Sequence, residues 1–333
     1  MRIAIVKLSA IGDIVHSMVV LQFIKSKYPD LIIDWFVDTQ LKDLLENNPH
    51  INKIQTIRLK EAKKNKSFWL FLKEMVKLKR YKKYDLVIDM QNLIKSALVA
   101  RLIPSIKTIG LDKNSSRERL ASIFYSQKIN IEHSSNVIKR NIAIISQALE
   151  MQISDNALKV KEPFLFFDSE KHFNLLQSEK PNILLIPGAS FQAKIYPADS
   201  YAEIIKNLQG NFFIIWGSQS ERLIAERIKL FSPQVTVLDK LTFDELKSFI
   251  SKINLVIGGD TGPVHMAWAL GIASITIFGP TPGYRNTFKT DINLIIESKS
   301  QVDPYKINKK DLSIKNINPI DIVKIAVKLL ENG

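Results

Sequence analysis

The 333-residue sequence contains no cysteine, which excludes disulfide bonds and metal sites built on thiolates. This composition is compatible with a reducing cytoplasm. No apolar run reaches the length of a membrane span, and residues 1–6 lead directly into a predicted strand without the apolar segment of a signal peptide. We therefore expect a soluble protein that remains in the cytoplasm.

Familiar metal and phosphate motifs are missing as well. The sequence has no Asp-X-Asp pair, so a carboxylate pair that holds a metal ion against a nucleotide diphosphate has no obvious candidate. It has neither a Gly-X-X-X-X-Gly-Lys loop nor a Gly-X-Gly-X-X-Gly loop. These absences favour catalysis by a helix N-terminus and a lysine, without a metal ion or another cofactor.

Positive charge is abundant and concentrated in one half of the chain. The formal net charge is +14; residues 1–150 carry 26 Lys and Arg against 14 Asp and Glu, whereas residues 151–333 carry 21 against 19. The segment 58–83 alone holds 11 basic and 2 acidic residues. We expect the first half of the chain to meet an anionic partner.

Short runs of Val, Ile and Leu alternate with amphipathic segments of helical length, a pattern typical of parallel sheets covered on both faces. The length of the chain favours two domains. We therefore predict two doubly wound α/β domains in tandem. The expected strands lie near residues 3–6, 33–37, 53–57, 86–89, 106–109, 183–186, 212–216, 235–238, 255–258, 274–278 and 293–296.

The boundary between the two domains is expected between residues 155 and 181, where the periodic pattern weakens. This gives an N-terminal domain over residues 1–160 and a C-terminal domain over residues 175–318. A final helix over residues 319–333 is a candidate for packing back on the first domain. Two such domains place a ligand at the C-terminal ends of both sheets, in a cleft between them.

The most informative stretch is GGDTGPVH, residues 258–265, in which a buried strand runs into an acid, a Thr-Gly pair and a helix. Pro263 suits the first position of that helix, and Gly271 suits its C-terminal cap. The next strand ends in another tight turn, residues 280–283. Two such strand ends side by side aim backbone N–H groups at one point, which suits a diphosphate.

Four polar side chains of the second half follow predicted strands. Asp260 is either a turn former or a carboxylate that grips sugar hydroxyls, and His265 is most simply a buried structural histidine. Lys194 is either a solvated lysine or the cation that neutralises a leaving diphosphate as charge develops. Glu221 stands where an acid commonly holds a nucleotide ribose.

The loop after the first strand, residues 7–13, carries Asp13 at the start of an apolar helix. In one interpretation Asp13 is a first-turn acid, favoured there by the free N–H groups and the dipole of the helix. In the other it is a general base that takes the proton of an attacking sugar hydroxyl. His16, one turn later, is a weaker candidate.

The basic segment 58–83 includes a helix whose apolar residues recur with helical spacing at positions 68, 71, 72, 75 and 78. One interpretation is a surface helix that turns this stripe to the core and its lysines to solvent. We prefer an additional role beside an anionic membrane surface or an acidic acceptor, because the charge exceeds what solubility requires. Nucleic acid is a further alternative, but no recognisable nucleic-acid module accompanies the segment.

Five blocks of the sequence carry a family resemblance: KLSAIGDIVHS at 7–17, LVIDMQNLIKSA at 86–97, SSRERLASIFYSQK at 115–128, KIYP at 194–197, and GGDTGPVH with FGPT within 258–281. Together they resemble the bacterial heptosyltransferases of glycosyltransferase family 9. The second and third blocks are similar to the type I enzymes of that family. The resemblance spans nearly the whole chain.

The resemblance implies a GT-B fold, in which two Rossmann-like domains face each other across a cleft. It also implies an inverting, metal-independent transfer of heptose from ADP-L-glycero-β-D-manno-heptose to the first Kdo of Kdo2-lipid A, at the cytoplasmic face of the inner membrane. Asp13 is then the general base and Lys194 the diphosphate contact. The implied donor residues are Ser190, Lys194, Glu221, Leu241, Asp260, Thr261, Gly262 and His265, and the implied acceptor residues are Ser9, Gly12, Lys60, Lys63, Lys64 and Arg117.

The chain departs from the family pattern at two places. In Gly188-Ala189-Ser190 only Ser190 supplies a hydroxyl, where type I enzymes often carry several, and Pro263-Val264 stands where Leu-Ser is common. These departures leave a type II or another family 9 acceptor open. More distant alternatives are a nucleotide-sugar 2-epimerase, which consumes its sugar nucleotide without an acceptor, and a nucleic-acid-binding module.

Overall fold

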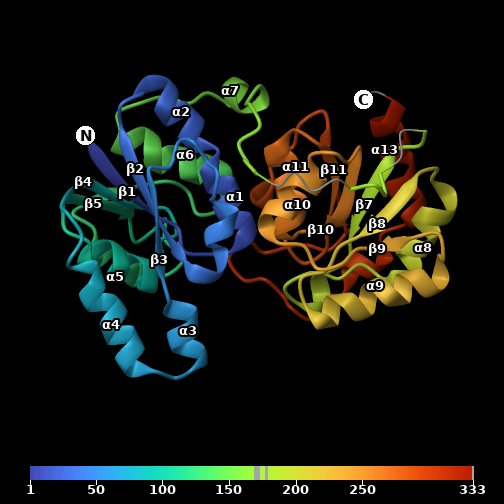
Figure 1. Cartoon of the computed structure of the whole chain (residues 1–333), viewed down its shortest axis with the longest axis horizontal. Coiled ribbons are helices and arrows are strands. Elements are labelled where there is room, and N and C mark those ends of the chain that lie inside the picture. Colours follow the sequence, from blue (N-terminus) through green and yellow to red (C-terminus); the bar gives the residue numbers. More distant parts are fainter. Residues whose placement is uncertain (169–172, 177–178, 332–333) are drawn as a thin grey trace. The chain divides into compact units, whose positions relative to one another are not determined.

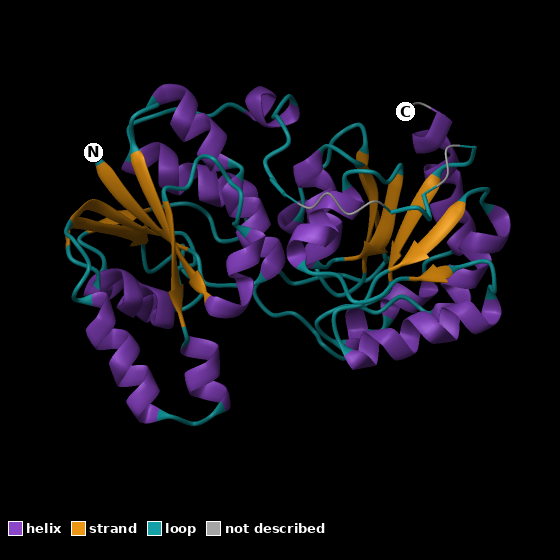
Figure 2. Cartoon of the chain, in the orientation of Figure 1, coloured by secondary structure: helices purple, strands orange, loops and turns teal. Residues whose placement is uncertain are grey.

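The computed structural model describes residues 1–168, 173–176 and 179–331. The chain divides into two compact units, Met1–Phe164 and Leu165–Gly333. Each unit is a parallel sheet with helices on both faces (Figures 1 and 2). The predicted tandem of two doubly wound α/β units is therefore confirmed, and the division falls inside the segment where the hydrophobic pattern weakens.

The first unit is built on six strands: β1 (Arg2–Val6), β2 (Ile32–Asp38), β3 (Lys53–Ile57), β4 (Tyr84–Asp89), β5 (Ser105–Leu111) and β6 (Gln127–Ile129). Its helices are α1 (Ile11–Met18), α2 (Val20–Lys27), α3 (Leu59–Lys64), α4 (Phe68–Leu78), α5 (Ile94–Leu102), α6 (Val137–Ala148) and α7 (Asp155–Lys159), with the 3-10 helices η1 (Thr39–Leu44) and η2 (Arg119–Phe124). The strand order is β3-β2-β1-β4-β5-β6, and all neighbours are parallel. Helices α1, α2 and α6 cover one face of the sheet, and α4 and α5 cover the other (Figure 1).

The second unit repeats this plan with β7 (Asn182–Ile186), β8 (Asn211–Ile214), β9 (Thr236–Val237), β10 (Leu255–Gly259), β11 (Ala273–Phe278) and β12 (Asn293–Glu297). Its helices are α8 (Ala198–Asn207), α9 (Gln219–Phe231), α10 (Phe243–Ile250), α11 (Gly262–Leu270), α12 (Gly283–Asn286) and α13 (Pro319–Glu331), with the 3-10 helices η3 (Gln192–Lys194) and η4 (Ser313–Asn316). The strand order is β12-β11-β10-β7-β8-β9, again all parallel. Both faces of β7 and β10 are covered, which explains why these strands are buried throughout and almost wholly apolar.

Helix α13 packs inside the second unit. It lies against α8 and β11, and its apolar residues Ile322, Val323, Ala326 and Leu329 belong to the core formed with Ile183 and other residues of the second sheet. The expectation that this final helix packs back on the first domain is therefore wrong. The apolar stripe of α13 covers a face of the second sheet. Sequence periodicity predicts such a stripe, but it does not indicate which of the two sheets a terminal helix covers.

Every predicted strand is present, and one strand was missed. Strand β6 has only three residues, and its first two, Gln127 and Lys128, are polar. It pairs with β5 at the edge of the sheet. A strand this short and polar gives no hydrophobic run to detect.

The two sheets share one topological feature that bears on function. In each, the order of the strands reverses between the two central strands, which are β1 and β4 in the first unit and β7 and β10 in the second. Open α/β sheets bind ligands in the crevice at the carboxyl ends of such a pair. The loops that follow these four strands are therefore the places to look for a site.

Candidate active site

The loop between β10 and α11 is the centre of the second unit's site. Strand β10 ends at Gly259, Asp260 follows it, Thr261 is the N-cap residue, and the helix begins at Gly262. Pro263 is therefore the second residue of α11 rather than the first. The helix ends where predicted, because Gly271 adopts the left-handed conformation with φ of 74°. The N–H of Gly262 thus lies next to Asp260, whereas Pro263 has no N–H and the N–H groups of Val264 and His265 donate to the carbonyl of Thr261 at 3.2 Å and 3.4 Å.

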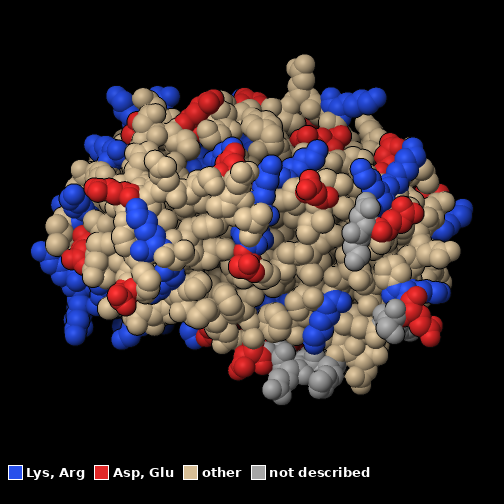
Figure 3. Space-filling view, turned by 90° about the horizontal axis from the view of Figure 1, so that it is seen from above, with Lys and Arg blue, Asp and Glu red and all other residues tan. Residues whose placement is uncertain are grey.

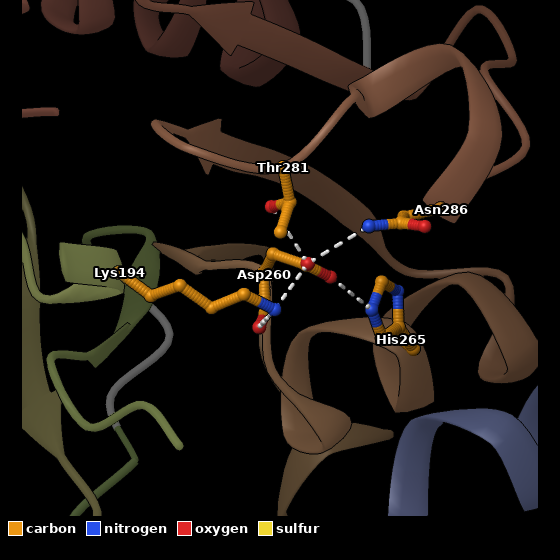
Figure 4. A network of polar contacts seen from close by, with 5 residues as sticks. All are labelled: Lys194, Asp260, His265, Thr281 and Asn286. Atoms are coloured by element: carbon orange, nitrogen blue, oxygen red, sulfur yellow. Dashed lines mark hydrogen bonds and ion pairs between the residues drawn. The ribbon is translucent and has the colours of Figure 1, made fainter. Parts of the chain in front are cut away.

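Asp260 is the hub of a polar network (Figure 4). One of its carboxylate oxygens, Oδ2, accepts from the ammonium of Lys194 at 2.5 Å, from the hydroxyl of Thr281 at 3.0 Å and from the amide of Asn286 at 3.2 Å. The other oxygen lies 3.1 Å from Nε2 of His265. Lys194 also donates to the carbonyl of Asp260 at 3.3 Å. Both carboxylate oxygens are thus engaged by protein groups.

The network keeps Asp260 ionised. Burial on its own raises the pKa of the Asp260 carboxyl, but the hydrogen bond from His265 and the charge of Lys194 outweigh it and hold that pKa well below its usual range. Asp260 therefore orients Lys194 and His265 around the start of α11. Its direct contact with sugar hydroxyls stays a prediction.

Two glycines of the GGDTGPVH stretch allow this close packing. A Cβ on Gly259 would lie 2.8 Å from the carbonyl oxygen of Lys194, and a Cβ on Gly258 would lie 2.7 Å from the carbonyl oxygen of Ile186. The segment that carries Lys194 can therefore cross directly beside the end of β10. The ammonium reaches Asp260 because a side chain is absent from the neighbouring residue.

Glu221 lies in the first turn of α9, where it completes a capping box. Its Oε2 accepts from the N–H groups of Gly217 at 2.6 Å and Ser218 at 3.2 Å. A Cβ on Gly188 would lie 2.6 Å from the carboxyl carbon of Glu221, so this side chain also crosses the loop after β7. The structure thus gives Glu221 a capping role, and its contact with a ribose stays a prediction.

Ser190 and Leu241 lie on other loops of the second unit. Ser190 is exposed on the loop after β7, and Leu241 is half-buried in the loop that follows β9. Their contacts with a nucleotide stay predictions.

Thr281 and Asn286 are site residues that sequence reasoning did not single out. Thr281 follows β11, the strand next to β10, and it lies in the tight turn and the FGPT block, neither of which indicates a contact with Asp260. Asn286 ends the short helix α12, and no motif marked it. They reach Asp260 across 21 and 26 residues of sequence.

The first unit presents Asp13 at its own switch point, in the first turn of the helix that follows β1. Asp13 is the third residue of α1, is exposed, and accepts a hydrogen bond from the N–H of Ala10 at 3.3 Å. Gly12 precedes it in the same turn, and Ser9 lies on the loop before the helix. The first-turn role of Asp13 is therefore observed, and its exposed carboxylate is also open to an acceptor.

The loop before Asp13 is held by the loop after β4. The side-chain oxygen of Gln91 accepts from the N–H groups of Leu8 at 2.7 Å and Ser9 at 3.2 Å. The N–H of Gln91 in turn donates to buried Asp89 at 2.8 Å. Gln91 thus fixes the backbone that precedes the candidate base. It lies in the 86–97 block, but its residue type alone did not indicate this role.

Lys7 lies buried at the same place. Its ammonium donates to the carbonyl of Met90 at 2.9 Å. Burial lowers the pKa of Lys7, while the negative charges of Asp13 and Asp89 oppose that shift. The buried ammonium of Lys7 is thus a positive charge next to the loop that leads to Asp13.

The predicted acceptor residues of the first unit lie on two segments. Lys60, Lys63 and Lys64 are exposed on α3, and within the described residues none of them forms an ion pair. Arg117 is exposed in the loop between β5 and η2. All four cations are thus available to an anionic ligand, and their contact with an acceptor stays a prediction.

The described part of the chain has neither a cluster of metal-binding side chains nor a helix suited to the membrane interior. No group of three or more His, Cys, Asp and Glu side chains there is arranged to hold a metal ion. No helix in that part combines the length and the hydrophobicity needed to span a bilayer.

Comparison with known proteins identifies the family. The family model described as glycosyltransferase family 9 (heptosyltransferase) matches residues 73–309. Lipopolysaccharide heptosyltransferase 1 of Campylobacter coli is 38% identical to this chain over 99% of both sequences. The chain belongs to glycosyltransferase family 9. A further relative in this family, lipopolysaccharide heptosyltransferase 1 of Escherichia coli K12, is 26% identical over 85% of this chain and 89% of its own.

Solved structures of family 9 proteins have the same fold. The Escherichia coli heptosyltransferase WaaC, solved with ADP, matches with a TM-score of 0.81 and 22% identity over 99% of this chain and 100% of that chain. A family 9 glycosyltransferase of Veillonella parvula matches with a TM-score of 0.82 and 17% identity over 100% and 98% of the two chains. The predicted GT-B fold is therefore confirmed.

In this family 9 glycosyltransferase the predicted donor residues do not all meet. Lys194, Asp260 and His265 form one network at the start of α11, with Thr261 and Gly262 in the adjoining turn. Glu221 lies at the start of α9 instead. The second unit thus offers half-buried Lys194 and the N-terminus of α11 after its central strands β7 and β10, and the N-terminus of α9 after β8, which suits a nucleotide diphosphate.

Proposed function

We propose that this family 9 enzyme is lipopolysaccharide heptosyltransferase I, which transfers L-glycero-D-manno-heptose from ADP-heptose to the first Kdo of Kdo2-lipid A. The observation that carries the donor half is the Lys194 ammonium held by Asp260 at the N-terminus of α11. Support for type I is the 38% identity with the Campylobacter coli enzyme over the full length of both chains.

The proposed reaction is a single displacement with inversion. Asp13 takes the proton of a Kdo hydroxyl as the oxygen forms a bond to the anomeric carbon of heptose. The bond from that carbon to the diphosphate breaks on the opposite face, and ADP leaves with the bonding electrons. Lys194 and the positive end of the α11 dipole, with the N–H of Gly262, stabilise the negative charge that develops on the diphosphate, so the reaction proceeds without a metal ion.

Mass spectrometry of a truncated Kdo-lipid A after incubation with ADP-heptose tests the acceptor. We expect the product to gain one heptose and ADP to be released in equal amount. Addition only to an acceptor that already bears heptose would assign the enzyme to type II. Consumption of the sugar nucleotide without any acceptor would favour an epimerase instead.

Substitution of Lys194 by Gln tests the donor half. We expect kcat to fall by about 10²–10³-fold, because the variant loses the cation at the leaving diphosphate. Lys229→Gln is the matched control, since Lys229 is an exposed lysine of the last turn of α9. Steady-state release of ADP measures both. A folded Lys194→Gln enzyme with turnover near that of the control would contradict the assignment.

We also propose that the enzyme works at the anionic cytoplasmic surface of the inner membrane. The support is the basic segment 58–83 on the unit that carries Asp13. Anionic lipids attract such segments over distances up to a Debye length. A nucleic-acid partner fits this charge less well, because no recognisable nucleic-acid module accompanies it.

A further inference from the structure

Two large aromatic residues lie exposed where α3 and α4 join. Phe68 and Trp69 open α4, and 66% and 81% of their surfaces are exposed. The other tryptophans of the chain are buried or half-buried. We call residues 65–69 the hairpin tip: residues 65–67 connect α3 and α4, the two antiparallel helices that project from the first unit (Figure 1), and residues 68 and 69 open α4.

Core packing does not explain the hairpin tip. Of the apolar stripe predicted for this helix, Met75 and Leu78 are buried in the core, and Phe71 is partly buried against it. The interpretation that Phe68 belongs to the core-facing stripe is wrong, because Phe68 lies outside the core and is exposed. Trp69 is not part of the stripe at all. An exposed pair of this size is more typical of an interaction site than of a solvated surface.

The apolar surface of the hairpin tip continues into a cavity of about 410 Å³. Phe68, Phe71 and Met75 line it from α4, and Leu98 lines it from α5. Lys63, Lys66 and Lys95 also line the cavity. An apolar hollow lined in part by lysines suits an amphipathic ligand such as a lipid, which has a hydrocarbon chain and an anionic headgroup.

The charge around the hairpin tip is almost entirely positive. The segment 58–83 holds 11 basic and 2 acidic residues, and one of the two acids, Glu74, is buried and paired with Arg58. Figure 3 shows a different face of the molecule, seen from above, on which Lys and Arg side chains also gather along the left-hand edge. So many cations in one segment match an extended anionic surface better than a single anionic group.

We propose that the hairpin tip inserts into the headgroup region of an anionic phospholipid bilayer. Phe68 and Trp69 enter the interface, where aromatic rings with one apolar and one wet side are favoured. The surrounding lysines pair with lipid phosphates, and the cavity accommodates part of an acyl chain. The inference deepens the proposed function, because a lipid-linked acceptor lies in such a surface, but the binding itself requires neither substrate.

Sedimentation of the full chain with vesicles tests the insertion. We expect binding to vesicles of phosphatidylglycerol and phosphatidylethanolamine, and much weaker binding to phosphatidylcholine alone. The double variant Phe68→Ser, Trp69→Ser is expected to lose at least about tenfold in partition to the anionic vesicles. The matched control is Leu230→Ser, Phe231→Ser, because this adjacent apolar pair is 81% and 51% exposed on α9 of the second unit. Its partition is expected to match that of the wild type.

Fluorescence locates the inserted residue. The emission of the wild type is expected to shift to the blue on anionic vesicles, and Trp69→Phe is expected to abolish the shift while retaining most of the binding. Equal sedimentation of the Phe68→Ser, Trp69→Ser variant and the wild type would overturn the proposal. So would binding only when Kdo2-lipid A is present, or binding of RNA with none to vesicles.

Two acceptors separate this inference from the proposed function. On a deacylated, water-soluble Kdo acceptor, kcat/KM of the Phe68→Ser, Trp69→Ser variant is expected to equal that of the wild type. On Kdo2-lipid A in vesicles its rate is expected to fall with its partition. If the wild type binds vesicles but transfers heptose to neither acceptor, the proposed function is contradicted and the proposed membrane insertion still holds. Equal loss on both acceptors would contradict the membrane role.

Discussion

Asp13→Asn is expected to lower kcat by about 10²–10⁴-fold, the usual contribution of a positioned general base. The amide cannot take the proton of the attacking hydroxyl. Its oxygen can still accept the hydrogen bond that Ala10 now donates to the carboxylate at 3.3 Å, so the start of α1 is preserved. The measurement is ADP release at saturating ADP-heptose and acceptor.

A matched control separates the loss of a base from the loss of a helix cap. Glu245 occupies the same third position in the capping box of α10, where it accepts from the N–H of Thr242 at 2.9 Å. Glu245→Gln changes the same chemistry at a helix to which we assign no catalytic role. We expect turnover close to that of the wild type. A folded Asp13→Asn enzyme that behaves like this control would remove Asp13 from the mechanism.

Asp260→Asn is expected to have the largest effect on stability. The variant leaves the ammonium of Lys194 without its counter-charge in a largely buried site, since 13% of the Lys194 side chain is exposed. Loss of one partner of a buried pair costs about 3–5 kcal/mol, and the remaining exposure of Lys194 places this case near the lower end. Turnover is expected to fall as well, because Lys194 and His265 lose the group that orients them. Urea unfolding of both proteins measures the difference in free energy of unfolding.

The control for Asp260→Asn is an exposed ion pair in the same unit. Asp321 and Lys324 lie 3.1 Å apart on α13, with 53% and 71% of their side chains exposed. Asp321→Asn is expected to change the free energy of unfolding by less than about 1 kcal/mol, because solvent screens the pair. If the two variants lost the same stability, the network around Asp260 would not be a structural centre of the site.

The stability of the wild type should also depend on pH through Asp260. The pKa of this carboxyl is lower in the folded protein than in the unfolded chain, so its contribution is fully present above the unfolded pKa of about 3.9. As the pH falls below that value, the unfolded chain takes up a proton that the folded protein refuses. The stability difference between wild type and Asp260→Asn should therefore be constant near neutrality and shrink below about pH 4. A difference that grew in acid would contradict this sign.

The strands and the first turns of helices could be predicted because they depend on neighbours in sequence. The buried strand before Asp260 and the left-handed cap at Gly271 follow from residue type and spacing. The parallel order of the sheet then predicts that the loops after neighbouring strands lie together, which is why Lys194 and Asp260 were both expected at a phosphate site. Family resemblance supplied their roles.

What the sequence determined by itself is the tandem α/β fold, the family, and the loops that carry Asp13, Lys194 and Asp260. Hydrophobic periodicity and short motifs are local patterns, so they can be recognised in one segment without information on the rest of the chain. Only the tertiary structure decided that Asn286 contacts Asp260 and that Gln91 holds the loop before Asp13. Such contacts depend on which loops the strand order brings together. They also depend on the close approach that a glycine such as Gly259 permits. The tertiary structure also decided that α13 packs on the second sheet and that the aromatic pair at the hairpin tip is exposed. A stripe of apolar residues in the sequence predicts a buried helix face, but it identifies neither the surface that covers this face nor the residue at which the core ends.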